Sequence, residues 1–271
     1  MRVVIFPEPG YEGEKLWQPA PNSWHLPYCE VRMLLEEKGH QVASFPCEVD
    51  ISHDVGLYCG LPIYPCPTLT RSLCIQLEPP IVPGRARFYE RMGGLPFTRI
   101  LTFVREFVDN KRVFYEIVPI MPYKGELAPI RDKYICAISG GGKEFPSVMV
   151  DGRVYESLFQ ARRFKYLEYG KLLHLYGNGW MLDTPENIEI RDKCEYMGEC
   201  KDKIHTMSQY HAAIVYENTD KTYTSEKYWD AVQSGCDFKR WYRGEIPEYP
   251  IEHADYRNWA KRIVKHLEEV S

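Results

Sequence analysis

The sequence predicts an α/β fold built from two Rossmann-like lobes that face a cleft. Short apolar, β-branched segments alternate with helical patterns in both halves, which is typical of sheets covered by helices. The 271 residues suffice for two modest domains. Prolines and a glycine at 119, 122 and 125 interrupt the pattern. We therefore expect an N-terminal lobe over residues 1–125, a second lobe over 126–250, and a C-terminal amphipathic helix within 251–271 that packs on the body.

The first lobe begins with an apolar, β-branched strand and continues with a long loop rich in proline, glycine and tryptophan at 7–27. Helices are expected from about Tyr28 to Gly39 and at Arg85 to Met92. The strands expected in this lobe are Arg2 to Phe6, Gln41 to Phe45, Val55 to Tyr58, Leu73 to Leu77, Arg99 to Phe103 and Val113 to Ile117. No GxGxxG follows the first strand, so the pattern does not predict NAD binding.

In the second lobe, a strand at Tyr134 to Ile138 leads into Ser139 and three glycines. Such a loop either cradles a phosphate or serves as a connector, and it lacks the Lys-Ser/Thr of a P-loop. A helix is expected at Tyr155 to Tyr169. Further elements are expected at Leu172 to Tyr176, a strand, and Lys201 to Tyr210, a helix.

The stretch from His211 to Cys236 has the strongest functional pattern. An apolar strand at Ala212 to Tyr216 ends in Glu-Asn-Thr-Asp, residues that favour turns. Thr224 or Ser225 then caps a helix that Gly235 ends. Ligands of open α/β sheets bind outside the carboxyl ends of strands, where helix N-termini attract anions. Lys227 adds a full cation there.

Composition narrows the class of protein. Hydrophobic residues at 44%, charged residues at 27% and a net charge of −4 are ordinary for a globular protein and provide no global basic field. Tight nonspecific binding of nucleic acid is therefore not indicated, although a local basic patch stays open. Nine cysteines without CxxC pairs indicate reduced thiols. The sequence contains no signal peptide pattern and no apolar run of membrane-spanning length. We expect a cytoplasmic protein, bacterial or, if viral, in the host cytoplasm, without a membrane span or a metal site.

The residues Tyr-Glu-Asn at 216–218, then Tyr223-Thr-Ser-Glu226-Lys227 and a helix ending in Gly-Cys, resemble the donor-binding signature of the α1,3/4-fucosyltransferases. The resemblance implies a divergent bacterial or viral member with a GT-B-like fold. Such a hexosyltransferase moves L-fucose from GDP-fucose, with inversion, to a hydroxyl of a glycan. The nucleotide sugar is a co-substrate, and no other cofactor is expected.

The resemblance also implies roles for individual residues. Lys227 and Arg163, or its neighbour Arg162, would bind the diphosphate; both arginines otherwise form a solvated helix face. The other donor-binding positions are Tyr223 on phosphate, Ser225 in the same string, Glu226 on the ribose, and Glu217 and Asn218 at the sugar. Without the resemblance, these residues would be turn formers and a first-turn carboxylate.

Glu78 is the predicted general base. Leu-Cys-Ile-Gln-Leu-Glu-Pro-Pro at 73–80 resembles the family segment in which a strand ends in a catalytic glutamate before a proline-containing loop. The segments ILTF and IVPIMPY follow at corresponding distances. An inverting transferase needs a carboxylate to take the proton of the acceptor hydroxyl. The first lobe would thus be the acceptor side.

Two alternatives stay open. The resemblance ends after Cys236, where only Trp241, Tyr242 and Gly244 match the family, so the chain is alternatively a catalytically inactive nucleotide-sugar-binding protein. A phage-type DNA glycosyltransferase acting on hydroxymethylated bases is the other alternative. Its phosphate track would consist of Arg85, Arg87, Arg91 and Arg105.

Overall fold

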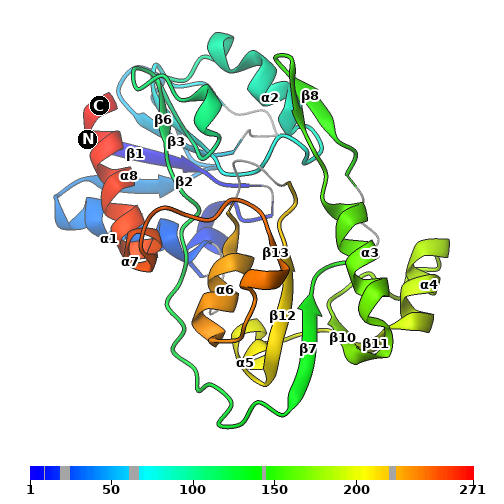
Figure 1. Ribbon diagram of the computed structural model, residues 1–271. Helices are drawn as coiled ribbons and strands as arrows, with labels where there is room; N and C mark the ends of the chain where they lie inside the picture. The colour runs from blue at the N-terminus through cyan, green and yellow to red at the C-terminus, as the bar shows by residue number, and fades with distance from the viewer. Residues whose placement is uncertain (9, 19–24, 61–66, 142–144, 220–223) are drawn as a thin grey trace. The chain divides into compact units, whose positions relative to one another are not determined.

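The computed structural model describes residues 1–8, 10–18, 25–60, 67–141, 145–219 and 224–271 (Figure 1). Contacts between Cα atoms divide them into two compact units. The first unit comprises residues 1–79, 84–121 and 248–271, and the second comprises 80–83 and 122–247. Each unit is α/β with a parallel sheet, which confirms the predicted fold class; the cleft stays a prediction.

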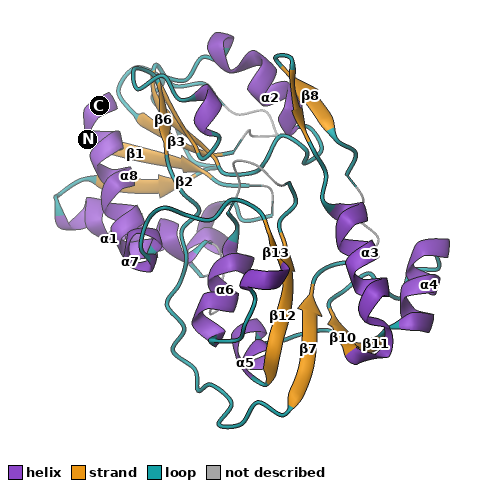
Figure 2. Ribbon diagram, in the orientation of Figure 1, coloured by secondary structure: helices purple, strands orange, loops and turns teal. Residues whose placement is uncertain are grey.

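The first unit contains a six-stranded sheet of order β2-β1-β3-β4-β5-β6, in which every pairing is parallel (Figure 2). Strand β3 is buried along its whole length and β1 is buried after its first residue, because helices cover both faces of such a sheet. The strands are β1 (Arg2–Phe6), β2 (Gln41–Ser44), β3 (Val55–Cys59), β4 (Arg71–Gln76), β5 (Arg99–Thr102) and β6 (Val113–Tyr115). The helices are η1 (Gly13–Trp17), α1 (Leu26–Glu37), α2 (Arg85–Arg91), η2 (Met92–Gly94), η3 (Arg105–Phe107), α7 (Ile251–Ala254) and α8 (Tyr256–Val270).

The C-terminal helix α8 is part of the first unit, although it follows the second unit in sequence. It packs on α1, where the rings of Tyr28 and Trp259 meet edge to face at 5.6 Å. Lys38 Nζ lies 2.6 Å from Glu268 Oε1 at the other end of this contact. The apolar stripe read from the sequence is buried, including Ile263 and Leu267.

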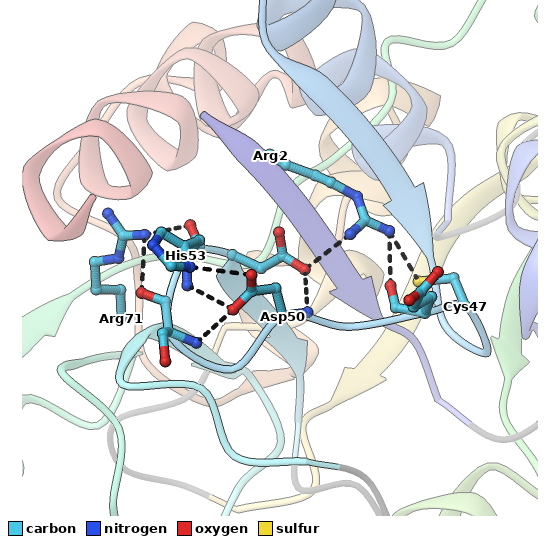
Figure 3. Close-up of polar contacts among 8 residues, drawn as sticks. Arg2, Cys47, Asp50, His53 and Arg71 are labelled. Atoms are coloured by element: carbon cyan, nitrogen blue, oxygen red, sulfur yellow. Dashed lines mark hydrogen bonds and ion pairs between the residues drawn. The ribbon is translucent and has the colours of Figure 1, made fainter.

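A polar network fixes the amino ends of the strands in the first unit (Figure 3). Arg2 donates a hydrogen bond to Asp54 Oδ2 at 3.0 Å, and Arg71 donates to the carbonyl of His53. Cys47 lies beside the same Arg2 guanidinium, whose charge lowers the pKa of the Cys47 thiol. Burial has the larger effect and raises that pKa. Since ligands bind at the carboxyl edge of parallel sheets, we interpret this network as structural.

The second unit contains a five-stranded parallel sheet of order β11-β10-β7-β12-β13. Apolar clusters cover both faces of it, one around Trp180 and one around Phe238. The strands are β7 (Lys133–Ile138), β10 (Leu173–Tyr176), β11 (Glu195–Gly198), β12 (Tyr210–Tyr216) and β13 (Tyr242–Arg243), with a separate hairpin of β8 (Val148–Val150) and β9 (Arg153–Tyr155). The helices are α3 (Phe159–Tyr169), η4 (Gly170–Leu172), α4 (Pro185–Lys193), α5 (Lys203–Ser208), α6 (Glu226–Ser234) and η5 (Lys239–Trp241).

The predicted helix at Tyr155 to Tyr169 was wrong at its start. Residues 153–155 instead form β9, which pairs antiparallel with β8, and the helix begins at Phe159. The turn between the two strands has Asp151 at φ 50° and Gly152 at φ 75°. An Asp-Gly pair with positive φ is the usual two-residue hairpin turn, so a local signal for this hairpin was present in the sequence.

The elements α4 and β11 were not predicted. Helix α4 carries strong start signals, because the Thr184 side chain accepts from the Asn187 N–H and Pro185 occupies the first helical turn. The sequence of α4 is mostly polar, so no apolar helical periodicity can be read from it. In the part of the chain that the structure describes, no helix is both long and apolar enough to cross a membrane.

Candidate functional site

The strand order of the second unit creates a topological switch point between β7 and β12. From β7 the chain runs outward to β10 and β11, and it then returns to the other side of β7 as β12. Ligands of such sheets bind in the crevice outside the carboxyl ends of the two strands at the switch. Ser139 follows β7 and Glu217 follows β12, so the motif selected from the sequence lies at this edge.

The described residues of the loop after β7, 139–141, are hydrogen-bonded to the end of β10 and the loop that follows it. Gly141 N–H donates to the Asn178 carbonyl at 2.8 Å, and Ser139 N–H donates to the Tyr176 carbonyl at 3.0 Å. A Cβ at Gly177, where φ is 128°, would overlap the Ser139 carbonyl. These two N–H groups are therefore committed within the unit, which favours the connector interpretation over a phosphate cradle. Gly142 lies outside the described residues.

Glu217 is the most buried carboxylate of the predicted site, at 1% exposure. Its Oε1 accepts from the Ser225 N–H at 2.9 Å. Its Oε2 has no hydrogen-bond partner within the described residues. Burial raises the pKa of Glu217, and the Lys227 charge opposes that rise. A buried oxygen left unsatisfied is costly, so this position is suited to a ligand hydroxyl.

Lys227 lies in the first turn of α6, which Ser225 caps by accepting the Lys227 N–H at 3.2 Å. Its Nζ donates to Asn218 Oδ1 at 3.2 Å and, more weakly, to the Tyr216 carbonyl at 3.5 Å. Burial lowers the pKa of Lys227, while Glu217 raises it. A partly desolvated cation at a helix N-terminus is an arrangement that binds anions such as phosphate.

Of the two adjacent arginines on α3, Arg162 is the one whose charge acts on Lys227, where it contributes to the lowered pKa. Its side chain is buried, its guanidinium lies 4.5 Å from the ring centroid of Phe159, and it reaches the Gly140 carbonyl at 3.4 Å. Arg163, the residue assigned from the resemblance, is half-buried and donates to Gln160 on the same helix at 3.4 Å. The structure thus brings Arg162 to the loop after β7.

The Glu226 carboxylate forms an ion pair with Lys203, a lysine that the sequence analysis did not select. Lys203 Nζ lies 2.6 Å from Glu226 Oε1 and 3.8 Å from Asp230 Oδ2. Burial raises the pKa of Asp230 to about 7. The i,i+4 spacing of Glu226 and Asp230 places them on one helix face, and this was the available signal. A ribose bound by Glu226 would have to share that carboxylate with Lys203.

The backbone after Glu217 is paired with the start of α3. Leu158 N–H donates to the Asn218 carbonyl at 3.1 Å, and Ser157 forms a β-bridge with Thr219. These pairs place Arg162, one turn further along α3, beside the same loop. Tyr223, the predicted phosphate ligand, lies outside the described residues.

The segment that departs from the fucosyltransferase pattern packs against Glu217. Tyr242 belongs to β13, the neighbour of β12, and its hydroxyl donates to the Glu245 carbonyl at 2.9 Å. A Cβ at Gly244 would lie 2.5 Å from both Glu217 Cγ and the Tyr242 hydroxyl. Thr224 also donates to the Glu245 carbonyl, at 2.6 Å. This wall of the site was not predicted, since it depends on contacts between residues far apart in sequence.

Glu78 belongs to the first unit and follows β4, at the carboxyl edge where the sequence placed it. Its N–H donates to Gln76 Oε1 at 3.4 Å, and its carbonyl accepts from the Tyr89 hydroxyl at 2.9 Å. The backbone is therefore fixed while the side chain is half-buried. Its role as a base stays a prediction. Within the described residues, no group of three or more His, Cys, Asp and Glu side chains is arranged to hold a metal ion.

Several solved structures resemble this chain. An alpha-glucosyltransferase in complex with UDP and a 13-mer DNA aligns at a TM-score of 0.48 and 13% identity, covering 100% of this chain and 90% of that one. HepE of Anabaena, in complex with UDP-glucose, aligns at 0.48 and 8% identity, covering 100% and 98%. A glycotransferase of kitacinnamycin aligns at 0.39 and 13% identity, covering 99% and 93%. Similarity of this extent carries no argument about substrate. No protein-family profile matches the chain, and no curated protein matches it in sequence.

Proposed function

We propose that this protein is a glycosyltransferase that uses a nucleotide-sugar donor bound at the switch point of the second unit. One observation carries the proposal: Lys227 and the buried Glu217 lie at the carboxyl end of β12, and Arg162 reaches the loop after the neighbouring β7. The two cations and the N-terminus of α6 suit a diphosphate. The Glu217 oxygen without a partner in the described residues suits a hydroxyl of the donor.

In the proposed reaction, the bond between the anomeric carbon and the diphosphate oxygen breaks, and the diphosphate leaves with the electron pair. Lys227 and Arg162 stabilise the negative charge that develops on it. The acceptor oxygen bonds to the opposite face of the anomeric carbon, which inverts its configuration. Glu78 of the first unit takes the proton of the acceptor hydroxyl, as the base does in an inverting glycosidase. Because these two cations offset the negative charge of the diphosphate, we propose a reaction that does not need a metal ion.

We propose GDP-fucose as the donor, on the resemblance of residues 216–236 to the fucosyltransferase signature. A glycan is the acceptor that the observations favour. Two arginines of the postulated DNA track each lie near a carboxylate that offsets their charge toward DNA phosphates, Arg85 at 3.6 Å from Glu8 and Arg105 at 3.9 Å from Glu248. With a net charge of −4 in addition, a phosphate track on the first unit is less well supported.

The test combines Glu78→Gln with a matched control, Glu90→Gln, on the exposed side of α2. Radiolabelled GDP-fucose is supplied with a glycan array and, separately, with a DNA duplex containing hydroxymethylcytosine. We expect transfer to glycans by the wild type and Glu90→Gln, and its loss in Glu78→Gln, with the donor dissociation constant unchanged by calorimetry.

Each part of the proposal has its own contradicting result. Unimpaired transfer by Glu78→Gln would remove the assigned base. Donor binding without transfer or hydrolysis in the wild type would favour the inactive binding protein, and transfer to the duplex alone would favour the DNA enzyme.

A further inference from the structure

The first unit has its own switch point, and a second carboxylate lies there. In the order β2-β1-β3-β4, the chain leaves β1 for β2 on one side and returns to β3 on the other. Glu8 follows β1 by two residues, and Gly60 directly follows β3. A Cβ at Gly60 would lie 3.5 Å from Glu8 Oε1, so the carboxylate extends over the junction of the two strands. Ligands bind in crevices at such positions.

Glu8 is paired with Arg85, and the pair is incompletely bonded. Arg85 Nη2 lies 3.6 Å from Glu8 Oε1, which is an ion pair but longer than a hydrogen bond. The Glu8 side chain is 35% exposed and that of Arg85 is 17% exposed. Arg85 Nε is buried and has no hydrogen-bond partner within the described residues. Within the described residues, Arg85 Nε thus keeps a hydrogen-bond donor that the fold does not use, and the partly exposed Glu8 carboxylate is accessible to a ligand.

An aromatic ring lies in the same turn. The Tyr11 N–H donates to the Glu8 carbonyl at 3.2 Å, which fixes the turn, and the Tyr11 ring is 39% exposed. That ring lies on the His25 imidazole, with the centroids 3.6 Å apart. A carboxylate and a partly exposed aromatic ring within one turn of the chain are groups suited to a sugar, which has hydroxyls at its edge and apolar C–H groups on its faces.

We propose that Glu8 and Arg85 bind the acceptor by reading a vicinal diol of a saccharide. One hydroxyl donates a hydrogen bond to the Glu8 carboxylate, and the adjacent hydroxyl accepts one from the Arg85 guanidinium. A charge-assisted hydrogen bond at each end makes the pair selective for two neighbouring hydroxyls over a lone one. The inference rests on the proposed function, which it deepens by naming the acceptor as a sugar ring with a free diol.

The test is saturation-transfer difference NMR with methyl β-D-galactopyranoside, which has vicinal diols, and tetrahydropyran-2-methanol, a ring with one hydroxyl. The variants are Glu8→Gln and Arg85→Gln, with Glu90→Gln and Arg87→Gln as controls at exposed positions of α2. We expect saturation of the galactoside in the wild type and in both controls. We expect at least a five-fold loss in Glu8→Gln and in Arg85→Gln, and no saturation of the lone-hydroxyl ring.

The same samples report on folding and on the donor site through the thermal shift that GDP and GDP-fucose cause. Should Glu8→Gln fail to fold, Arg85→Lys retains the charge and tests the guanidinium geometry instead. Equal saturation of wild type and both site variants, or none in the wild type, overturns the diol site. A galactoside signal that depends on Glu8 without any nucleotide shift supports the diol site and contradicts the donor site alone.

Discussion

Replacing Lys227 with methionine separates a binding role from a structural one. Methionine is unbranched, has similar reach and packs well in irregular apolar surroundings. Burial lowers the pKa of Lys227, which means that desolvation of the charged ammonium costs free energy in the folded state. The methionine variant does not have this cost. Asn218 loses a donor, but it is half-buried rather than fully enclosed. Glu217 loses the cation that opposes the rise in its pKa, so in the variant this buried carboxyl more readily takes up a proton and is then neutral. We expect Lys227→Met to melt no lower than the wild type without ligand.

The effect on nucleotide binding has the opposite sign. Among the described residues, Asn218 Oδ1 and the Tyr216 carbonyl use two of the three N–H donors of Lys227, which leaves the third for a phosphate oxygen. Hydrogen bonds to charged groups contribute about 1.5–3 kcal/mol, so the dissociation constant should rise by roughly 10- to 150-fold. At a nucleotide concentration about 100 times the wild-type dissociation constant, ligand stabilisation of about 2.7 kcal/mol would fall to about 0.9 kcal/mol for a 30-fold loss of affinity. The thermal shift should drop from roughly 5 °C to roughly 1.5 °C for a chain of 271 residues.

Differential scanning fluorimetry with and without nucleotide measures both effects, and Lys193→Met, an exposed lysine of α4, is the matched control. A variant that melts below the wild type yet keeps its full shift would refute the reasoning and make Lys227 structural. The affinity should also depend on pH. A bound phosphate raises the lowered pKa of Lys227, so binding takes up a proton and weakens as the pH rises through the free-state pKa, below 10.5.

Three further substitutions test other parts of the site. Arg162→Met should weaken nucleotide affinity about ten-fold in calorimetry and Arg163→Met less than two-fold, because Arg162 is the arginine that acts on the site; the reverse ranking would restore the original assignment. Asp230→Asn should gain melting temperature over the wild type between about pH 5 and pH 8. Burial raises the native pKa of Asp230 from 3.8 to about 7, so its contribution to stability is complete below the unfolded value and is lost as the pH rises through 7; a gain independent of pH would contradict this. Gly244→Ala should cost about 1–3 kcal/mol in urea unfolding, because its methyl group meets Glu217 at 2.5 Å, and an unchanged midpoint would show that the contact relaxes.

The strand and helix around the site could be predicted because their signals are local. The strand predicted at Ala212 to Tyr216 is β12, and α6 begins after the Ser225 cap and ends at Gly235, which is left-handed with φ 67°. The terminal helix α8 lies within the predicted range 251–271 for the same reason, since its apolar period is continuous.

What could not be predicted depends on which side chain faces the sheet or on distant contacts. Arg162 and Arg163 are about 100° apart on one helix, and only packing shows that Arg162 is buried. The position of Gly244 against Glu217 requires β13 to pair with β12, and no local sequence pattern predicts that pairing. The Lys203 pair with Glu226 likewise joins two helices.

The most direct test of the donor site is the thermal stabilisation of the wild type across GDP-, UDP-, CMP- and dTDP-sugars and their free nucleotides, because a ligand that binds only the folded state raises its melting temperature. We predict a selective shift with GDP and GDP-fucose. A shift with UDP-sugars alone would contradict the GDP-fucose assignment and leave the glycosyltransferase proposal standing, whereas no shift with any nucleotide would contradict the donor site itself.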